Sequence, residues 1–196
     1  MGPGLHSWDA FEAVVLKLGG EISDAFVQLG SLDYRAAGRF VSRLPYGRNK
    51  AVHGSLIVLQ EGRGTCSTKH AILRRLAIEQ AVDVALVIGI YAMHERNTPG
   101  VGPVLRKYGL SSLPEAHCYL RFREKRVDVT RPIKANRPER TARFLYEEDI
   151  APEQIGEYKT GLHRRFLQRW IAETADGRGL DEIWRIREEC ISALSR

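Results

Sequence analysis

Apolar positions along the 196-residue chain recur with helical spacing in some segments and run continuously in others. Helical spacing predicts amphipathic helices over Trp8–Leu18, Asp33–Leu44 and Ser67–Gln80, the second of which ends before Pro45. The continuous apolar run Val82–Tyr91 is rich in Val and Ile and predicts a buried strand. Strands and helices therefore both contribute to the fold.

The remaining segments are also predicted to be a mixture of helices, strands and loops. The expected elements are a loop over residues 93–114 with a short helix Val104–Tyr108, strands Ala116–Phe122 and Arg126–Val129, and helices beyond Pro138 to the end, broken near Pro152 and Asp176–Gly179. The apolar run Leu56–Leu59 is too short to distinguish a strand from a buried helix. This order predicts an α+β fold in one domain over residues 1–196, with a core of about 33–135 and a C-terminal helical appendage of about 138–196.

Composition narrows the classes of protein. Hydrophobic residues make up 43% of the chain and charged residues 28%, which is typical of a soluble globular domain, and the net charge of +6 permits an anionic partner without requiring one. We expect no nucleic-acid partner.

The longest apolar stretch contains Asp83 and is too short to cross a membrane, and the early acidic residues Asp9 and Glu12 argue against a signal peptide. Three cysteines, an odd number, argue against a disulfide framework and favour the cytoplasm.

Cys66 is the candidate nucleophile. It lies where the glycine-rich turn Gly62–Gly64 leads into a predicted helix that Thr65 can cap. Unpaired N–H groups and the helix dipole at such a position favour an anion, so the thiol ionises more readily. Its backbone N–H is also free to bind an oxyanion.

His117 and Asp128 are the candidate base and orienting acid, on consecutive predicted strands. A turn at Phe122–Arg123 would place position 117 directly opposite 128, whereas a turn at Glu124–Lys125 would pair Arg121 with Asp128 and separate the histidine from the acid by roughly 13 Å. The turn sequence contains neither Gly nor Asn, so both registers remain open.

Other groups of side chains that could form a functional site have less support in the sequence. His70 follows Cys66 by four residues and is an alternative base, or a zinc ligand together with Cys66, His117 and Cys118. Because residues 117 and 118 point to opposite faces of a strand, and the chain has no Cys-x-x-Cys pair, we expect no metal. The basic hairpin tip, Arg121–Arg126, is typical of a solvated turn.

Three motifs in order resemble the transglutaminase-like superfamily of the papain-like cysteine fold. Gly64-Thr65-Cys66 resembles its Gly-x-Cys turn, Glu115-Ala116-His117 its histidine strand, and Val127-Asp128-Val129-Thr130 its Asp-Pro-Thr segment, with Val129 in place of proline. The resemblance covers about residues 60–130. Tyr119 stands where the family commonly has Trp.

The resemblance implies a cofactor-free thiol enzyme with Cys66 as nucleophile, His117 as general base and acid, and Asp128 as the orienting group. Its substrate would be a peptide, a protein or a small amide, and hydrolysis and transamidation both remain open. Gln60 has the spacing to Cys66 that papain-like enzymes use for an oxyanion donor, while Asn97 and Tyr119 are candidate substrate contacts. The alternative is a catalytically silent module of the same fold that binds a protein or an anionic partner.

Overall fold

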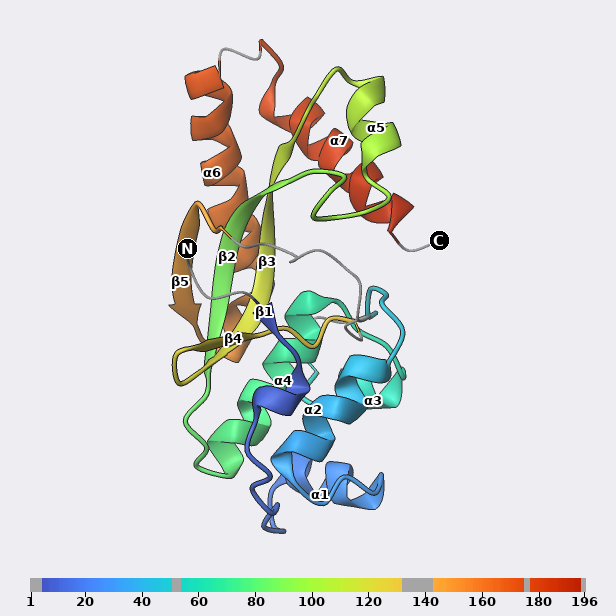
Figure 1. Ribbon diagram of the computed structural model, residues 1–196, viewed down its shortest axis with the longest axis vertical. Coiled ribbons are helices and arrows are strands. Elements are labelled where there is room, and N and C mark those ends of the chain that lie inside the picture. The colour runs from blue at the N-terminus through green and yellow to red at the C-terminus, as the bar shows by residue number, and fades with distance from the viewer. Residues whose placement is uncertain (1–4, 51–53, 132–142, 175–176, 195–196) are drawn as a thin grey trace.

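The structure, a computed structural model, describes residues 5–50, 54–131, 143–174 and 177–194 (Figure 1). The helical elements are η1 (Trp8–Ala10), α1 (Glu21–Gln28), α2 (Tyr34–Arg43), α3 (Ile57–Gln60), α4 (Cys66–Glu79), α5 (Gly102–Lys107), η2 (Pro152–Ile155), α6 (Glu157–Thr174) and α7 (Leu180–Ala193). The strands are β1 (Leu5–His6), β2 (Ala85–Met93), β3 (Leu113–Phe122), β4 (Lys125–Val127) and β5 (Tyr146–Ile150).

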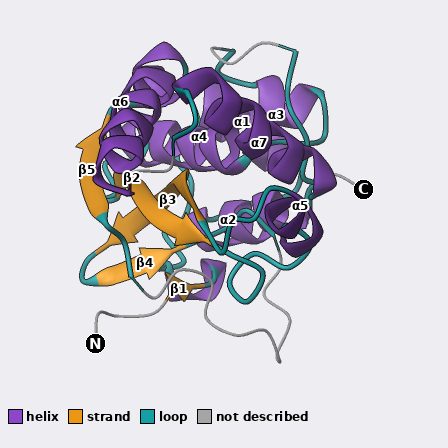
Figure 2. Cartoon of the chain, turned by 90° about the horizontal axis from the view of Figure 1, so that it is seen from above, coloured by secondary structure: helices purple, strands orange, loops and turns teal. Residues whose placement is uncertain are grey.

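The strands form one sheet in the order β1-β4-β3-β2-β5. Strands β2 to β5 pair in an antiparallel manner, and the two-residue β1 adds to β4 in parallel. The long central strands β2 and β3 run between two groups of helices, α1–α4 at one end and α5–α7 at the other (Figure 1). Seen from above, most of the helices lie to one side of the sheet (Figure 2). The chain is therefore an α+β protein, as the element order predicts.

Two apolar clusters hold these layers together. The larger one packs α4 against one face of the sheet and takes in buried residues from Phe11 to Leu162. The smaller one joins the end of β2 to α5, α6 and α7. Residues on both sides of the expected 33–135 core thus contribute to the same packing, while the expected boundary near residues 135–138 lies outside the described residues.

Most of the predicted elements are confirmed. Asp33 caps α2 by accepting from the N–H of Ala36 at 2.7 Å, and α4, α5, α7 and β2 to β4 lie where the pattern places them. The prediction of a helix over Trp8–Leu18 is wrong, because the chain turns after η1 and Val15 bridges Asp33 in an extended segment. The prediction of helix between Pro138 and the break near Pro152 is also wrong, because β5 adds an edge strand to β2 there.

Candidate functional site

Cys66 is the first residue of α4, and its local sequence fixes that position. The Thr65 hydroxyl accepts from the N–H of Thr68 at 3.5 Å, and the Thr68 hydroxyl accepts from the N–H of Thr65 at 3.0 Å. A Cβ on Gly64 would lie 2.9 Å from the side chains of Lys69 and Thr68, so only glycine fits there. The N–H of Cys66 consequently stands in the first turn, where a helix supplies no acceptor of its own.

The hairpin adopts neither of the two expected registers. Arg121 pairs with Arg126 and Phe122 with Lys125, so the turn is Arg123–Glu124, with Arg123 at φ 53°. This register lies midway between the two alternatives. By extension it places Asp128 beside Tyr119 and diagonal to His117, on the same face of the sheet.

The diagonal placement still joins the two candidate residues. The Nε2–H of His117 donates to Asp128 Oδ2 at 3.1 Å. Asp128 Oδ1 accepts from the N–H of Thr130 at 2.8 Å, and the N–H of Asp128 donates to the carbonyl of His6 at 2.9 Å. The carboxylate is therefore fixed on both oxygens and can orient the imidazole.

The thiol of Cys66 completes this line of groups. Cys66 and His117 line the same pocket, and each shifts the pKa of the other, so the two side chains lie side by side. Because Nε2 of the ring faces Asp128, Nδ1 is the nitrogen that remains for the sulfur. Burial lowers the pKa of His117, but the charges of Asp128 and Cys66 outweigh it and raise that pKa to about 10. Burial likewise opposes ionisation of Asp128, and the imidazolium holds the pKa of that carboxyl well below its usual range.

Cys118 also reaches the candidate nucleophile. The sulfurs of Cys118 and Cys66 both contact the hydroxyl of Ser67, at 3.7 and 4.0 Å. The thiol of Cys118, together with the charges of Lys159 and His117, lowers the pKa of Cys66 well below the ordinary value despite burial. His117 and Cys118 leave opposite faces of β3, so a sulfur that contacts both lies at the edge of this strand. Strand β4 pairs only with Leu120–Phe122, which leaves that edge open to α4 among the described residues.

His70 does not act as the alternative base. Its ring is fully buried, Nδ1–H donates to the carbonyl of Cys66 at 2.6 Å, and Nε2 accepts from the N–H of Val129 at 2.9 Å. Burial is the main reason that its pKa falls to about 4, so the ring is neutral. His70 therefore ties the start of α4 to the segment that carries Asp128.

Two pockets open onto Cys66. The larger has a volume of about 280 Å³ and the smaller about 60 Å³, and both are lined by Tyr46, Cys66, Glu115 and Ile191. The larger pocket lies between α4, α6 and α7, and most of its lining residues are polar. Its walls also include Arg48, Asn49, Thr65, Ser67, Thr68, Ile155, Lys159, Thr160, His163, Trp184, Arg187 and Glu188. His117 and Asp128 line the smaller one.

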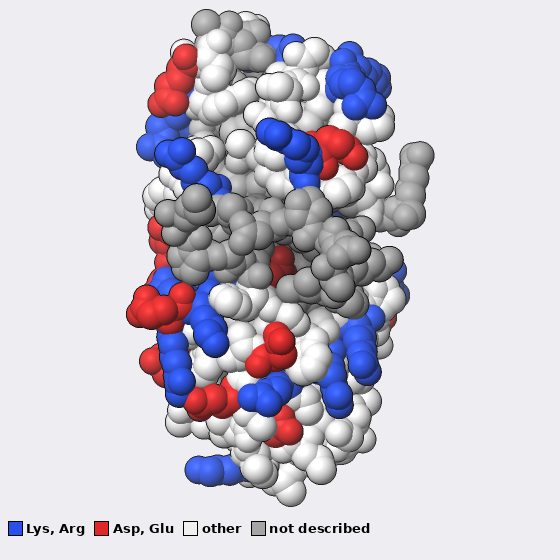
Figure 3. Space-filling view, viewed as in Figure 1, with Lys and Arg blue, Asp and Glu red and all other residues white. Residues whose placement is uncertain are grey.

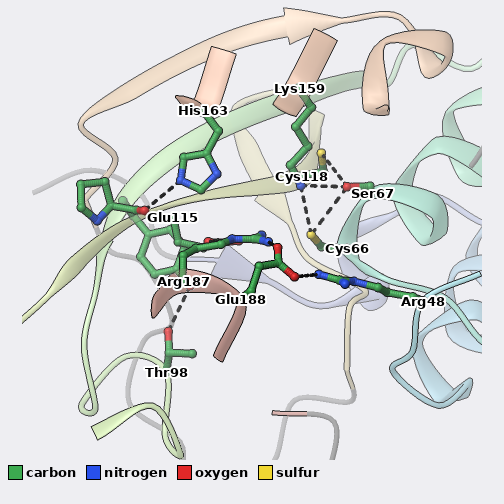
Figure 4. Close-up of polar contacts among 12 residues, drawn as sticks. Arg48, Cys66, Ser67, Thr98, Glu115, Cys118, Lys159, His163, Arg187 and Glu188 are labelled. Atoms are coloured by element: carbon green, nitrogen blue, oxygen red, sulfur yellow. Dashed lines mark hydrogen bonds and ion pairs between the residues drawn. The ribbon is translucent and has the colours of Figure 1, made fainter. Parts of the chain in front are cut away.

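A network of ion pairs holds the wall of the larger pocket (Figure 4). Arg187 of α7 binds both carboxylate oxygens of the buried Glu115, at 2.5 and 2.7 Å, and also contacts Glu188. Arg48 pairs with Glu188 at 2.5 Å. Sequence reasoning missed this network, because its members come from β3, α7 and the turn before α3.

The other expected site residues have different outcomes. Gln60 is exposed at the end of α3 and lines neither pocket, so the structure does not bring it to Cys66. Tyr119 lines neither pocket either; its ring stacks on Phe144 at 5.1 Å and its hydroxyl donates to Glu147. Asn97 does line the smaller pocket, where its amide donates to the carbonyl of Ala92 at 2.9 Å.

The described residues hold no cluster of three or more His, Cys, Asp or Glu side chains that could bind a metal ion. In the same part of the chain, no helix combines the length and the apolar character needed to cross a membrane. Basic side chains on the face shown in Figure 3 lie in separate groups with acidic ones between them, rather than in one continuous stripe.

Comparisons of the chain with models of protein families, with curated proteins and with solved structures each found no match. The site geometry is thus the basis for any assignment of function.

Proposed function

We propose that this protein is a thiol enzyme of the transglutaminase-like type that breaks amide bonds through a Cys66–His117–Asp128 triad. The observation that carries the proposal is the line of groups beside one pocket: a thiol at the start of α4, an imidazole next to it, and a fixed carboxylate bound to that ring. Nucleophilic catalysis requires this combination of nucleophile, base and orienting group. The line opens onto a pocket large enough for part of a peptide or a small amide.

In the first step, the thiolate of Cys66 attacks the amide carbonyl carbon, and the C=O electron pair moves to the oxygen. The backbone N–H of Cys66 is placed to donate to that oxyanion. The tetrahedral species then collapses, the C–N bond breaks, and the imidazolium of His117 gives its proton to the leaving amine. The product is a thioester on Cys66 and a neutral imidazole.

In the second step, His117 takes a proton from water or from an incoming amine, which attacks the thioester carbonyl. The C–S bond breaks, the thiolate is restored, and the acyl group leaves as a carboxylic acid or as a new amide. Asp128 keeps the ring in place and stabilises its charged form throughout. The two pockets beside Cys66 give the leaving group and the acceptor separate approaches to the sulfur.

The test uses a panel of peptide and small-molecule p-nitroanilides, with and without a primary amine such as glycine methyl ester. Wild type should release p-nitroaniline, Cys66→Ala should release none above background, and His117→Ala should lose about 10²–10⁴-fold in rate. Cys190→Ala is the matched control, because this thiol is buried in the α5–α7 cluster and lines neither pocket. Intact mass spectrometry should find a hydroxylamine-sensitive acyl adduct on Cys66. Release that is equal in wild type and Cys66→Ala across the panel would refute the proposal.

A further inference from the structure

Lys159 is a buried charged residue of the site that the triad does not use. It lies in the first turn of α6, and only 9% of its surface is exposed. Its ammonium donates to the hydroxyl of Ser67 at 2.8 Å and to the sulfur of Cys66 at 3.6 Å (Figure 4). A buried ammonium is costly unless an anion balances it, so the identity of that anion matters.

The nearby carboxylates are already committed to other cations. Both oxygens of Glu115 bind Arg187, and Glu188 lies between Arg187 and Arg48. Among the described residues, no carboxylate lies within ion-pair distance of Lys159. Asp128 is held by His117 on the other side of the sulfur. The anion that remains for Lys159 is the thiolate of Cys66.

The titratable and charged groups around the sulfur belong to every element packed against it. They are Tyr46 and Arg48 before α3, Lys69 and His70 on α4, Glu115, His117 and Cys118 on β3, Asp128 and Arg131 after β4, Lys159 and His163 on α6, and Arg187 and Glu188 on α7. The ammonium of Lys69 donates to the carbonyls of Leu44 and Thr130. Burial lowers the pKa of Lys159, but the sulfurs of Cys118 and Cys66 and the carboxylate of Glu115 raise it above the usual value. Lys159 is consequently a permanent cation rather than an amine nucleophile.

We propose that Lys159 is a catalytic residue that binds the Cys66 thiolate in the resting enzyme and then the oxyanion that forms during attack on the substrate. An ammonium has three N–H donors, of which Ser67 and Cys66 take two in the described structure. The third is available to the larger pocket, which Lys159 lines. When the sulfur attacks, its negative charge moves to the carbonyl oxygen. The ammonium stays in place and now stabilises the negative charge on that oxygen.

This assignment rests on the proposed function, and it fills the oxyanion role that was expected of Gln60. It also makes ionisation of the thiol depend on Lys159 as well as on His117. A Cys–His pair alone would lose its thiolate when the histidine is removed. Here Lys159 keeps a cation beside the sulfur in a His117→Ala variant.

The experiment compares wild type with Lys159→Met, which keeps the length of the side chain without its charge, and Lys159→Arg, which keeps the charge. Lys107→Met is the control, because this exposed lysine pairs with Glu189 away from the site. The first measurement is the rate of alkylation of Cys66 by the uncharged reagent iodoacetamide from pH 5.5 to 9.5, with the modified thiol mapped by mass spectrometry. The second is kcat at pH 9.5 for the best amide of the panel.

Lys159 Nζ lies 3.6 Å from the sulfur, and loss of an opposite charge this close raises the pKa of a thiol by about 1–3 units. Lys159→Met should therefore slow alkylation of Cys66 at pH 6 by about tenfold or more. Lys159→Arg and Lys107→Met should retain the wild-type profile. At pH 9.5, where ionisation of Cys66 is largely restored, Lys159→Met should still lose about 10²–10³-fold in kcat. If Lys159→Met does not fold, Ser67→Ala, which removes the hydroxyl that holds the ammonium, should produce a smaller shift in the same direction.

A Lys159→Met profile that superimposes on wild type, or a kcat at pH 9.5 equal to that of wild type, would overturn the assignment. The two proposals fail in different ways. If wild type cleaves no amide but the alkylation profile of Lys159→Met moves, the proposed function fails and the pairing of Lys159 with the thiolate stands.

Discussion

Asp128→Asn is the substitution that most directly tests the electrostatics of the site. It replaces the carboxylate that accepts from His117 by an amide of the same shape and removes one of the two anions beside the imidazolium. The pKa of His117 is about 10, against 6.5 for an unperturbed histidine. That difference of about 3.5 pH units corresponds to about 5 kcal/mol, at about 1.36 kcal/mol for each unit, which is what the interaction with neighbouring anions leaves after the cost of burial.

Two anions, Asp128 and the Cys66 thiolate, share this interaction. Removal of one should lower the pKa of His117 by about 1–3 pH units, which is about 1.4–4 kcal/mol. The sign for stability follows from the raised pKa. The contribution of His117 is fully present below pH 6.5 and is lost as the pH rises through about 10, so wild type should lose unfolding free energy over that window and Asp128→Asn should lose less.

The assay is an NMR titration of the histidine ring signals between pH 5 and 11, with His117 assigned by comparison with His117→Ala. Asp149→Asn is the control. Asp149 lies on the edge strand β5, where it forms an exposed ion pair with Arg121 outside the site. Wild type and control should titrate near pH 10, and Asp128→Asn between about pH 7 and 9. A wild-type His117 that titrates near pH 6.5, or equal values in wild type and Asp128→Asn, would refute the reasoning.

Three further outcomes can be measured with the same protein. Gly64→Ala places a Cβ 2.9 Å from Lys69 Cγ, so we expect a loss of about 1–3 kcal/mol in urea unfolding. His70, whose pKa is about 4, should make wild type lose up to about 3 kcal/mol of unfolding free energy as the pH falls from 6.5 to 4, and His70→Gln should weaken that dependence. Cys118→Ala removes the neighbouring thiol that contributes most to lowering the pKa of Cys66 and should move the alkylation midpoint of Cys66 to higher pH.

Each of these outcomes has a matched comparison. Gly179→Ala, at a position with no atom within 4 Å of the added Cβ, should leave the urea midpoint unchanged. For the acid dependence, the comparison is His94→Gln, at a partly exposed loop position. Cys190→Ala should leave the alkylation midpoint of Cys66 where it is in wild type. For each pair, an equal effect in the test variant and its control would contradict the prediction made for that pair.

The sequence predicts the elements that carry Cys66, His117 and Asp128, because these elements depend on strong local signals. The helix that begins at Cys66 has a cap and a regular apolar face, and Val82–Tyr91 is a continuous apolar run of strand-forming residues. The Trp8–Leu18 prediction fails because helical spacing does not require a helix. Phe11 is buried there, but Val15 and Leu18 are 73% and 71% exposed, so the segment does not present one continuous apolar face to the core.

The register of the hairpin could not be derived from local sequence. Arg123 adopts φ 53°, a conformation that Gly or Asn would have signalled and that an arginine does not. Strand β5 gives an equally weak signal, because Glu147 and Asp149 alternate with other polar side chains on an exposed edge. Partners distant in the chain decide both features: β1 in the first case and β2 in the second.

The position of Lys159 on α6 is a signal in the sequence that this lysine has a partner elsewhere in the chain. It is 93 positions from Cys66, so no motif around the cysteine could include it. On α6, however, Lys159 precedes Leu162 and His163 by three and four residues, and all three are buried. A lysine on the apolar face of an amphipathic helix must find an acceptor inside the protein, because a long charged side chain otherwise points to water. That position in the periodic pattern indicates a buried charge that requires an anion. In a chain whose one candidate anionic thiol is Cys66, the cysteine is the partner to test first.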